Sequence, residues 1–145
     1  QVKGNSYKED LISEDALAVI GWSGDITQIN FENEDKWAFA IPTGGGTLWS
    51  DNMLIPIGSP YKTNAETLMN YYYDPAVAAE VAAYVNYISP VQGAKEEMAN
   101  IDPSLVDNPL IFPTDEYLQN VKVFRTLTAE EDTKYSTEFQ KVLGN

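Results

Sequence analysis

Trp49 and Asp51 stand two residues apart in a segment, residues 43–57, that begins with a glycine run and continues with strand-forming residues. In a β-strand, residues two apart project from the same face, so an indole ring and a carboxylate would face the same space. This pair suits a small organic cation, because the carboxylate supplies the opposite charge and the ring adds cation–π attraction. Alternatively, Trp49 packs in the core and Asp51 is a solvated strand end. The pattern alone leaves both interpretations open.

The composition narrows the classes of function. The 145 residues include 22 acidic and 9 basic side chains, for a formal net charge of −13, and neither cysteine nor histidine. This excess of acids argues against nucleic acid and anionic membranes as partners, since phosphate binding needs clustered Lys and Arg. The missing residue types exclude disulfides, thiolate nucleophiles, His-based triads and the usual zinc sites. The sequence gives enzymatic chemistry no support, and we expect no cofactor and no metal.

Three further patterns do not carry chemistry. Residues 21–24, Gly-Trp-Ser-Gly, are similar to a nucleophile elbow, but the second glycine is misplaced and no histidine exists to activate Ser23. The three tyrosines at 71–73 suggest ferric-iron ligands, but successive helical residues point about 100° apart and cannot converge on one ion. We expect Tyr72 to lie in the core instead. The glycine run at 43–47 lacks the lysine of a phosphate loop and is expected to be a flexible connector.

The first third of the chain is predicted to alternate between short strands and helices, because apolar runs are bounded by turn residues. The expected elements are a buried strand at 17–22, further strands at 37–42 and around Trp49, a helix over 6–13 with Leu11 and Ile12 buried, and a helix through Ile29 that residues 33–35 end.

The remainder is predicted to be helical. Asp74 and Pro75 form an N-cap followed by proline at the first helical position, residues 102–103 repeat the signal, and residues 128–131 form a capping box. Gly144 stops the last helix. Strands followed by helices indicate the α/β or α+β class. The predicted apolar stripes are Ala65, Leu68, Met69 and Tyr72; Val77, Val81, Tyr84, Val85 and Ile88; and Tyr135, Phe139, Val142 and Leu143.

Aromatic residues gather at the ends of the expected elements. Trp22 ends a strand, Trp49 lies within one, and Tyr87 ends a helix just before Ser89. Packing explains each of them taken alone. Their shared position favours a binding site, because binding residues concentrate at element ends and loops.

Four blocks of sequence, in this order and at these intervals, resemble the spermidine/putrescine-binding proteins of bacterial ABC transporters; they are residues 18–25, 42–51, 74–78 and 87–91. The most specific element is the tryptophan-x-aspartate that follows a glycine-containing turn. The resemblance covers nearly the whole chain, but only the C-terminal part, somewhat under half, of a typical family member.

This resemblance implies a fold and a role. The fold is the type II periplasmic-binding-protein fold, in which two α/β lobes close over a polyamine and the loaded protein delivers it to a membrane permease. The implied location is periplasmic or extracellular, attached to the outer face of the cytoplasmic membrane in a Gram-positive organism.

The resemblance also implies site residues. Trp22 and Trp49 match the aromatic walls that enclose the methylene chain, and Asp51 matches the carboxylate that pairs with one terminal ammonium. Tyr87 matches an aromatic hydroxyl near the ligand, and Gln119 matches a late polar contact. No catalytic residue and no metal ligand is implied.

By the same analogy, residues 1–50 and 96–145 belong to the second lobe, and residues 51–95 pack on the first. The start of the chain, without Met and entering a polar helix at once, is typical of the middle of a protein, so an N-terminal lobe is expected from the same protein or another chain. Without that lobe, the stripes of Tyr72 and Val81 lack a partner layer. The alternatives are the same fold binding another organic cation, an amino acid or ferric iron, and a protein-interaction module that binds no small molecule.

Overall fold

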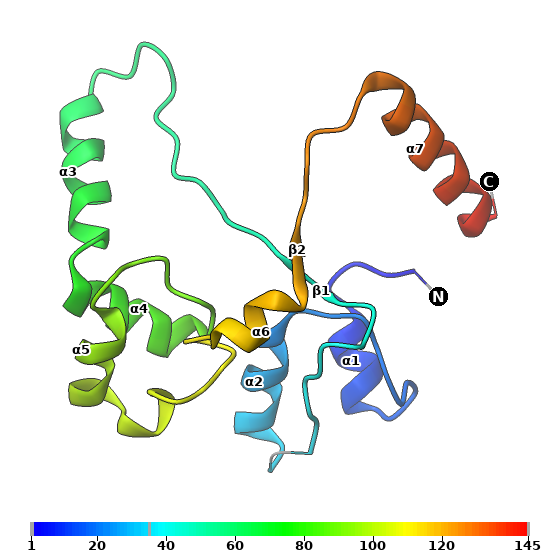
Figure 1. Ribbon diagram of the computed structural model, residues 1–145, viewed down its shortest axis with the longest axis horizontal. Helices are drawn as coiled ribbons and strands as arrows, with labels where there is room; N and C mark the ends of the chain where they lie inside the picture. The colour runs from blue at the N-terminus through cyan, green and yellow to red at the C-terminus, as the bar shows by residue number, and fades with distance from the viewer. Residues whose placement is uncertain (1, 35, 145) are drawn as a thin grey trace.

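The computed structural model of the chain describes residues 2–34 and 36–144 (Figure 1). Helices dominate it, and two short strands form the one sheet of the described residues. The elements in chain order are α1 (Tyr7–Ile12), α2 (Ser23–Glu32), β1 (Gly46–Leu48), α3 (Lys62–Tyr72), α4 (Pro75–Val85), α5 (Ala94–Ile101), the 3-10 helix η1 (Pro103–Leu105), α6 (Asp115–Gln119), β2 (Val121–Val123) and α7 (Ala129–Leu143).

The sheet joins two distant parts of the chain. β1 and β2 pair in parallel, with Gly46 opposite Val121. A tight turn precedes β1, because the amide of Gly45 donates to the carbonyl of Pro42 over 2.8 Å and the amide of Gly46 donates to that of Asn120 over 3.0 Å. Gly45 has a φ of +95°, and a Cβ there would lie 3.0 Å from the Asn120 carbonyl oxygen, so the position requires glycine. Residues 46–47 thus belong to β1, and the predicted connector is limited to the turn that precedes the strand.

The predicted N-terminal strands are largely absent. Residues 17–22 form no strand, and Leu17 and Ile20 are 96% and 102% exposed. Residues 37–42 also form no strand, although the side chains at 36–41 alternate between exposed and half-buried as in extended chain. The strand predicted around Trp49 ends at Leu48. A strand needs a neighbour for its ladder of hydrogen bonds, and among the described residues only β2 supplies one.

A first core forms between α1 and α2. Its buried side chains are Tyr7, Leu11, Ile26 and Ile29, against which Val19, Trp37 and Phe39 pack. The helix predicted at 6–13 is confirmed as α1, but Ile12 is 45% exposed and the prediction that it is buried is wrong. Tyr7 takes its place, because it lies four residues before Leu11 and therefore on the same helical face.

A second core forms between α4 and α5. The predicted cap of α4 is confirmed, since Asp74 Oδ1 accepts a hydrogen bond of 3.0 Å from the Ala76 amide. The predicted stripe of α4 is half-buried except at Tyr84, which is exposed, as expected when its partner layer is missing. The fully buried face of α4 is made of alanines, whose small side chains allow α5 to approach closely. The buried side chains of this core form two adjoining clusters that both contact Phe112, and they are Ala78, Ala79 and Ala94 in one and Ala82, Met98 and Ile111 in the other.

The end of α4 is sharply defined. Asn86 is buried, adopts the left-handed conformation with a φ of +58°, and donates through Nδ2 to the carbonyls of Ala83 and Tyr84 over 3.3 Å each. Asparagine tolerates this conformation better than most residues. Asn86 therefore ends the helix and directs the chain into Tyr87.

Helices α3 and α7 bury none of their residues. Tyr72 is consequently not a core residue, contrary to prediction, although an uncovered α3 stripe is expected when a partner layer is missing. The predicted capping box of Thr128 and Glu131 is confirmed, and Gly144 ends α7 in the left-handed conformation. Figure 1 shows α7 apart from the other helices. None of the described helices is long and apolar enough to cross a bilayer.

Candidate functional site

Three aromatic rings from three separated segments meet in one cluster. Trp22 immediately precedes α2, Trp49 immediately follows β1, and Tyr87 follows the end of α4. The ring centroids of Trp22 and Trp49 lie 5.4 Å apart at 75°, and those of Trp49 and Tyr87 lie 5.5 Å apart at 68°. These edge-to-face contacts fall in the favourable range for aromatic pairs. We call these three residues the aromatic trio.

The aromatic trio lies where the two cores meet. Trp22 belongs to the chain entering α2 of the first core, and Tyr87 leaves α4 of the second. The two sides touch at Gly24, where an added Cβ would lie 2.4 Å from Cε2 of Tyr87. Trp22 and Trp49 remain 47% and 39% exposed, so part of their surface is open to a ligand. Ligand sites commonly form at such junctions between packed bodies.

A hydrogen-bond network holds the backbone that carries Trp22 of the aromatic trio. The hydroxyl of Tyr7 donates to Asp25 Oδ2 over 2.5 Å and accepts from the Trp22 amide over 3.0 Å. The ammonium of Lys8 lies 3.6 Å from Asp25 Oδ1. Burial and the bond to Asp25 raise the pKa of Tyr7 to about 12, so its hydroxyl stays protonated at neutral pH.

The same network reaches Tyr87. Burial, with a further effect of the Asp25 charge, raises the pKa of Tyr87, and backbone hydrogen bonds from Asp25 and Gly24 act in the opposite direction. The Tyr87 ring lies against Gly24 at the start of α2, and the raised pKa keeps its hydroxyl neutral at physiological pH. A neutral phenol can donate a hydrogen bond as well as accept one from an ammonium group.

Asp51 lies two residues beyond Trp49 in an irregular, exposed segment. Because β1 ends at Leu48, the same-face argument that assumed a strand does not apply here. No ion pair or hydrogen bond occupies its carboxylate among residues 2–34 and 36–144. Asp51 thus differs from Asp25, whose two oxygens contact Tyr7 and Lys8.

Gln119 is not part of the cluster. It is the exposed last residue of α6 and precedes the N-terminal end of β2, whereas Trp49 follows the C-terminal end of β1. Because the strands are parallel, these residues flank opposite ends of the ladder. Its neighbour Asn120 contacts the turn before β1 through its carbonyl and through Nδ2, which donates to Pro42 over 3.3 Å.

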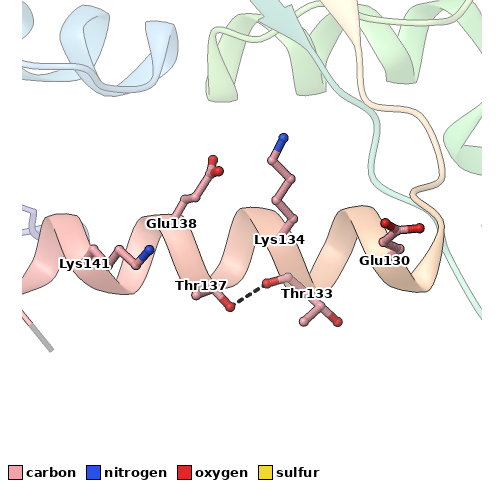
Figure 2. Close-up of a pocket in the computed structure, with 6 residues that line it drawn as sticks. All are labelled: Glu130, Thr133, Lys134, Thr137, Glu138 and Lys141. Carbon is pink, nitrogen blue, oxygen red and sulfur yellow. Dashed lines mark hydrogen bonds between the residues drawn. The ribbon is translucent and has the colours of Figure 1, made fainter.

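Elsewhere in the described chain, one hollow lies at the end of α3 and another lies on α7. No group of three His, Cys, Asp or Glu side chains in the described residues could hold a metal ion. The hollow in Figure 2 follows one face of α7 and, being lined by a single helix, encloses nothing; its residues are Glu130, Thr133, Lys134, Thr137, Glu138 and Lys141.

Sequence reasoning missed Tyr7, Gly24 and Asp25 as supporting residues. The available signal was the spacing of residues 21–25, in which two glycines flank Trp22 and Ser23 and an acid follows at the start of a helix. The partners of these residues lie up to 63 positions away in the sequence, where no local pattern reveals them.

Comparison with known proteins identifies the family. Residues 2–113 match the sequence profile of a family described as bacterial extracellular solute-binding proteins. The chain belongs to this family. The α/β fold class predicted from the sequence, and the resemblance to polyamine-binding proteins, are thereby confirmed. No solved structure matches this solute-binding protein significantly.

Several curated proteins are similar to this solute-binding protein. A putrescine/agmatine-binding protein of Pseudomonas aeruginosa is 28% identical over 81% of the chain and 33% of its own length. The putrescine-binding periplasmic protein PotF of Escherichia coli is 27% identical over 75% of the chain and 30% of its own length. A norspermidine sensor of Vibrio cholerae is 33% identical over 49% of the chain and 20% of its own length.

The chain thus spans about a third or less of these relatives. The relatives are named for binding or sensing and not for catalysis. The description of the family as extracellular, and the word periplasmic in the relatives' names, indicate a location outside the cytoplasm.

Proposed function

We propose that this chain supplies one wall of a polyamine site in the solute-binding component of a bacterial ABC importer. One observation carries the proposal: the aromatic trio assembles at the junction of two cores, two residues from the unpaired carboxylate of Asp51. The names of the relatives supply the ligand class, because they are named for binding or sensing putrescine, agmatine and norspermidine.

The chemistry of the four residues fits a polyamine. A polyamine is a flexible apolar rod with an ammonium group at each end. The half-exposed faces of Trp22 and Trp49 would cover the methylene chain, and cation–π attraction adds to this near the ends. Asp51 would neutralise one ammonium, which loses strong hydration on entry and needs a charged partner. The neutral hydroxyl of Tyr87 would offer a hydrogen bond.

The partners follow from the same proposal. The exposure of Trp22 and Trp49 leaves the opposite wall to residues outside this chain, which we propose belong to an N-terminal lobe. Closure of the lobes would exclude water, strengthen the ion pairs and present the loaded protein to a membrane permease. We propose that it acts at the outer face of the cytoplasmic membrane, as in a Gram-positive organism.

We also propose a division of the chain between lobes, with residues 1–50 and 96–145 in the second lobe and residues 51–95 in the first. The position of the second crossing near Lys95 stays a prediction, and the packing across it argues for a later crossing. Met98 and Ile111 share one core with Ala82, so a boundary at Lys95 would cut through packed side chains.

The test is a thermal-shift series on the chain with putrescine, spermidine, an amino acid and a ferric salt. A ligand present at 100 times its dissociation constant should stabilise the chain by about 2.7 kcal/mol. We expect a shift with the polyamines alone, and its loss in Asp51→Asn. Asp132→Asn is the matched control, because it makes the same change at an exposed carboxylate on α7, a helix that buries nothing.

The other outcomes of this series would indicate a different function. A shift with a neutral or anionic solute that survives Asp51→Asn would identify another ligand class and refute the polyamine proposal. If no ligand raises the melting temperature of the chain, the series is repeated on a protein that includes the N-terminal lobe. If no ligand raises it there either, the protein-interaction module that binds no small molecule is the interpretation that remains. Gln119 stays a prediction, and Gln119→Ala in the same series tests whether its amide contributes.

A further inference from the structure

We propose that Tyr7 is a positioning residue of the binding site: with Asp25, its hydroxyl fixes Trp22 and the start of α2, against which the Tyr87 ring of the aromatic trio packs. The inference rests on the proposed function for its ligand, but the positioning itself can be observed without one. Tyr7 lies outside the four residues proposed to touch the polyamine.

The first contact acts on Trp22. Trp22 has an extended backbone just before α2, and its amide donates to the Tyr7 hydroxyl over 3.0 Å. The Tyr7 ring also closes the space beside the preceding Gly21, where an added Cβ would lie 2.6 Å from Cε2 of Tyr7. The backbone that carries the Trp22 indole is therefore held from one side by a ring and from another by a hydrogen bond.

The second contact acts on Tyr87 through the start of α2. The Tyr7 hydroxyl donates to Asp25 Oδ2, and the Tyr87 ring packs against the neighbouring Gly24, where an added Cβ would lie 2.4 Å from Cε2 of Tyr87. Gly24 makes room for the Tyr87 ring in the same way as Gly21 does for Tyr7. Residues 21–25 thus contact two tyrosine rings, that of Tyr7 in the first core and that of Tyr87 in the chain after α4, and Trp22 lies between the two glycines.

The hydroxyl of Tyr7 is not needed to fill the core. The side chain is only 8% exposed and packs beside Leu11 and Ile29, where a phenylalanine ring would fill the same volume. Its hydroxyl bonds only to the Asp25 carboxylate and the Trp22 amide among the described residues. Asp25 in turn is occupied by Tyr7 and Lys8, so it supports the site and is not a free carboxylate for ligand.

Tyr7→Phe tests the proposal, because it removes both hydrogen bonds and keeps the ring. Two indoles at 5.4 Å and a wide angle give an exciton signal in far-ultraviolet circular dichroism, and this signal reports the position of Trp22 against Trp49 in the ligand-free chain. Trp49→Phe calibrates the signal, since it removes one partner. Tyr84→Phe on the exposed face of α4 is the matched loss of a hydroxyl.

We expect Tyr7→Phe to remain folded, to lose most of the exciton signal, and to bind putrescine about tenfold more weakly, which corresponds to about 1.4 kcal/mol. Tyr84→Phe should keep both the signal and the affinity. A residue that merely stabilises the fold would lower the melting temperature and leave the exciton signal of the folded chain unchanged.

The outcomes separate the two proposals. If the wild-type chain binds no putrescine, the proposed function fails on this chain and the exciton signal alone decides the role of Tyr7. An unchanged exciton signal in folded Tyr7→Phe overturns the positioning role, and so does a lost signal with unchanged putrescine affinity where the wild type binds. If Tyr7→Phe does not fold, two variants of Asp25 take its place. Asp25→Ala must lose the exciton signal, and Asp25→Asn, which keeps an acceptor for the Tyr7 hydroxyl, must retain it. Any other pattern overturns the proposal.

Discussion

Replacing Gly24 by alanine is expected to move Tyr87 while leaving the free energy of unfolding nearly unchanged. The added Cβ would lie 2.4 Å from Cε2 and 2.6 Å from Cζ of Tyr87. The favourable separation between two carbon atoms is about 3.5 Å or more, so the Tyr87 ring must move by about 1 Å. Because the ring is half-buried and follows the end of α4, it has room to move outward.

The size of the effect follows from two terms of opposite sign. Moving the ring gives up its edge-to-face contact with Trp49, and such pairs contribute about 0.5–1.5 kcal/mol. Alanine is favoured over glycine within a helix by up to about 1 kcal/mol, and Gly24 is the second residue of α2. The net change should therefore stay below about 1 kcal/mol.

Gly21→Ala provides the contrast. Its Cβ would lie 2.6 Å from Cε2 of Tyr7, which is buried in the first core, and Gly21 lies outside any helix. Overpacking of this kind costs about 1–3 kcal/mol with no gain from helix propensity. Gly44→Ala is the control, because nothing lies within 4 Å of its Cβ.

Urea unfolding measures the three stabilities, and near-ultraviolet circular dichroism measures the surroundings of the Tyr87 and Trp49 rings. The expected result is a changed aromatic spectrum in Gly24→Ala at nearly wild-type stability, a loss of stability in Gly21→Ala, and neither in Gly44→Ala. An unchanged aromatic spectrum in Gly24→Ala, or equal destabilisation by Gly24→Ala and Gly21→Ala, would refute the reasoning.

Three further predictions concern stability. Asn86→Ala should cost about 1–2 kcal/mol in urea unfolding, because alanine resists the left-handed conformation with a φ of +58°, and Asn86→Gly should restore most of it; equal losses would contradict this. The pKa of Tyr7 is raised from 10.0 in the unfolded chain to about 12, so its contribution is complete below pH 10 and about 2–3 kcal/mol is lost as the pH rises to 12. Unfolding between pH 9 and 12 measures that loss, which must be smaller in Tyr7→Phe. Arg125 holds the pKa of Glu131 at about 2, below the ordinary 4.5, so the N-terminal turn of α7 is supported above pH 4.5 and loses that support as the pH falls toward 2; Glu131→Gln should show less helix at neutral pH by circular dichroism and a smaller acid-induced change. An identical acid profile in both proteins would argue against it.

Local signals in the sequence predicted the capped starts of α4 and α7, whereas no local signal marked α5 or α6. Asp74 and Thr128 cap their helices through hydrogen bonds to amides two or three residues away, so the information needed lies within one turn. The failures concern long-range partners. Residues 17–22 have the apolar composition of a strand, but a strand also needs a neighbour, and no local pattern states whether one is present.

In α4, the sequence did not reveal which face packs within this chain. Its valines and Tyr84 have the larger apolar surface and so define the predicted stripe, whereas close packing against α5 selects the alanine face. Hydrophobicity is greatest on the helix face that carries the large side chains. Two helices approach most closely, however, on the faces that carry small side chains.

The residues of the candidate site were also predictable only in part. The resemblance pointed to Trp22, Trp49 and Tyr87, which the structure brings into one cluster. Tyr7 and Gly24 could not be predicted, because their importance comes from contacts with Asp25 and Tyr87 that only the folded chain creates.

The presence of two cores has a consequence for how the molecule opens. Within the described residues the two cores share no buried side chain, and each is closed by its own helices. Units of this kind open independently, so backbone amides of α2 should exchange with deuterium as one group and those of α4 and α5 as another, after the amides of α3 and α7. A ligand that touches both Trp22 and Tyr87 would link the two units. Its binding would then be visible as slower exchange in both helical groups together, far from the rings themselves.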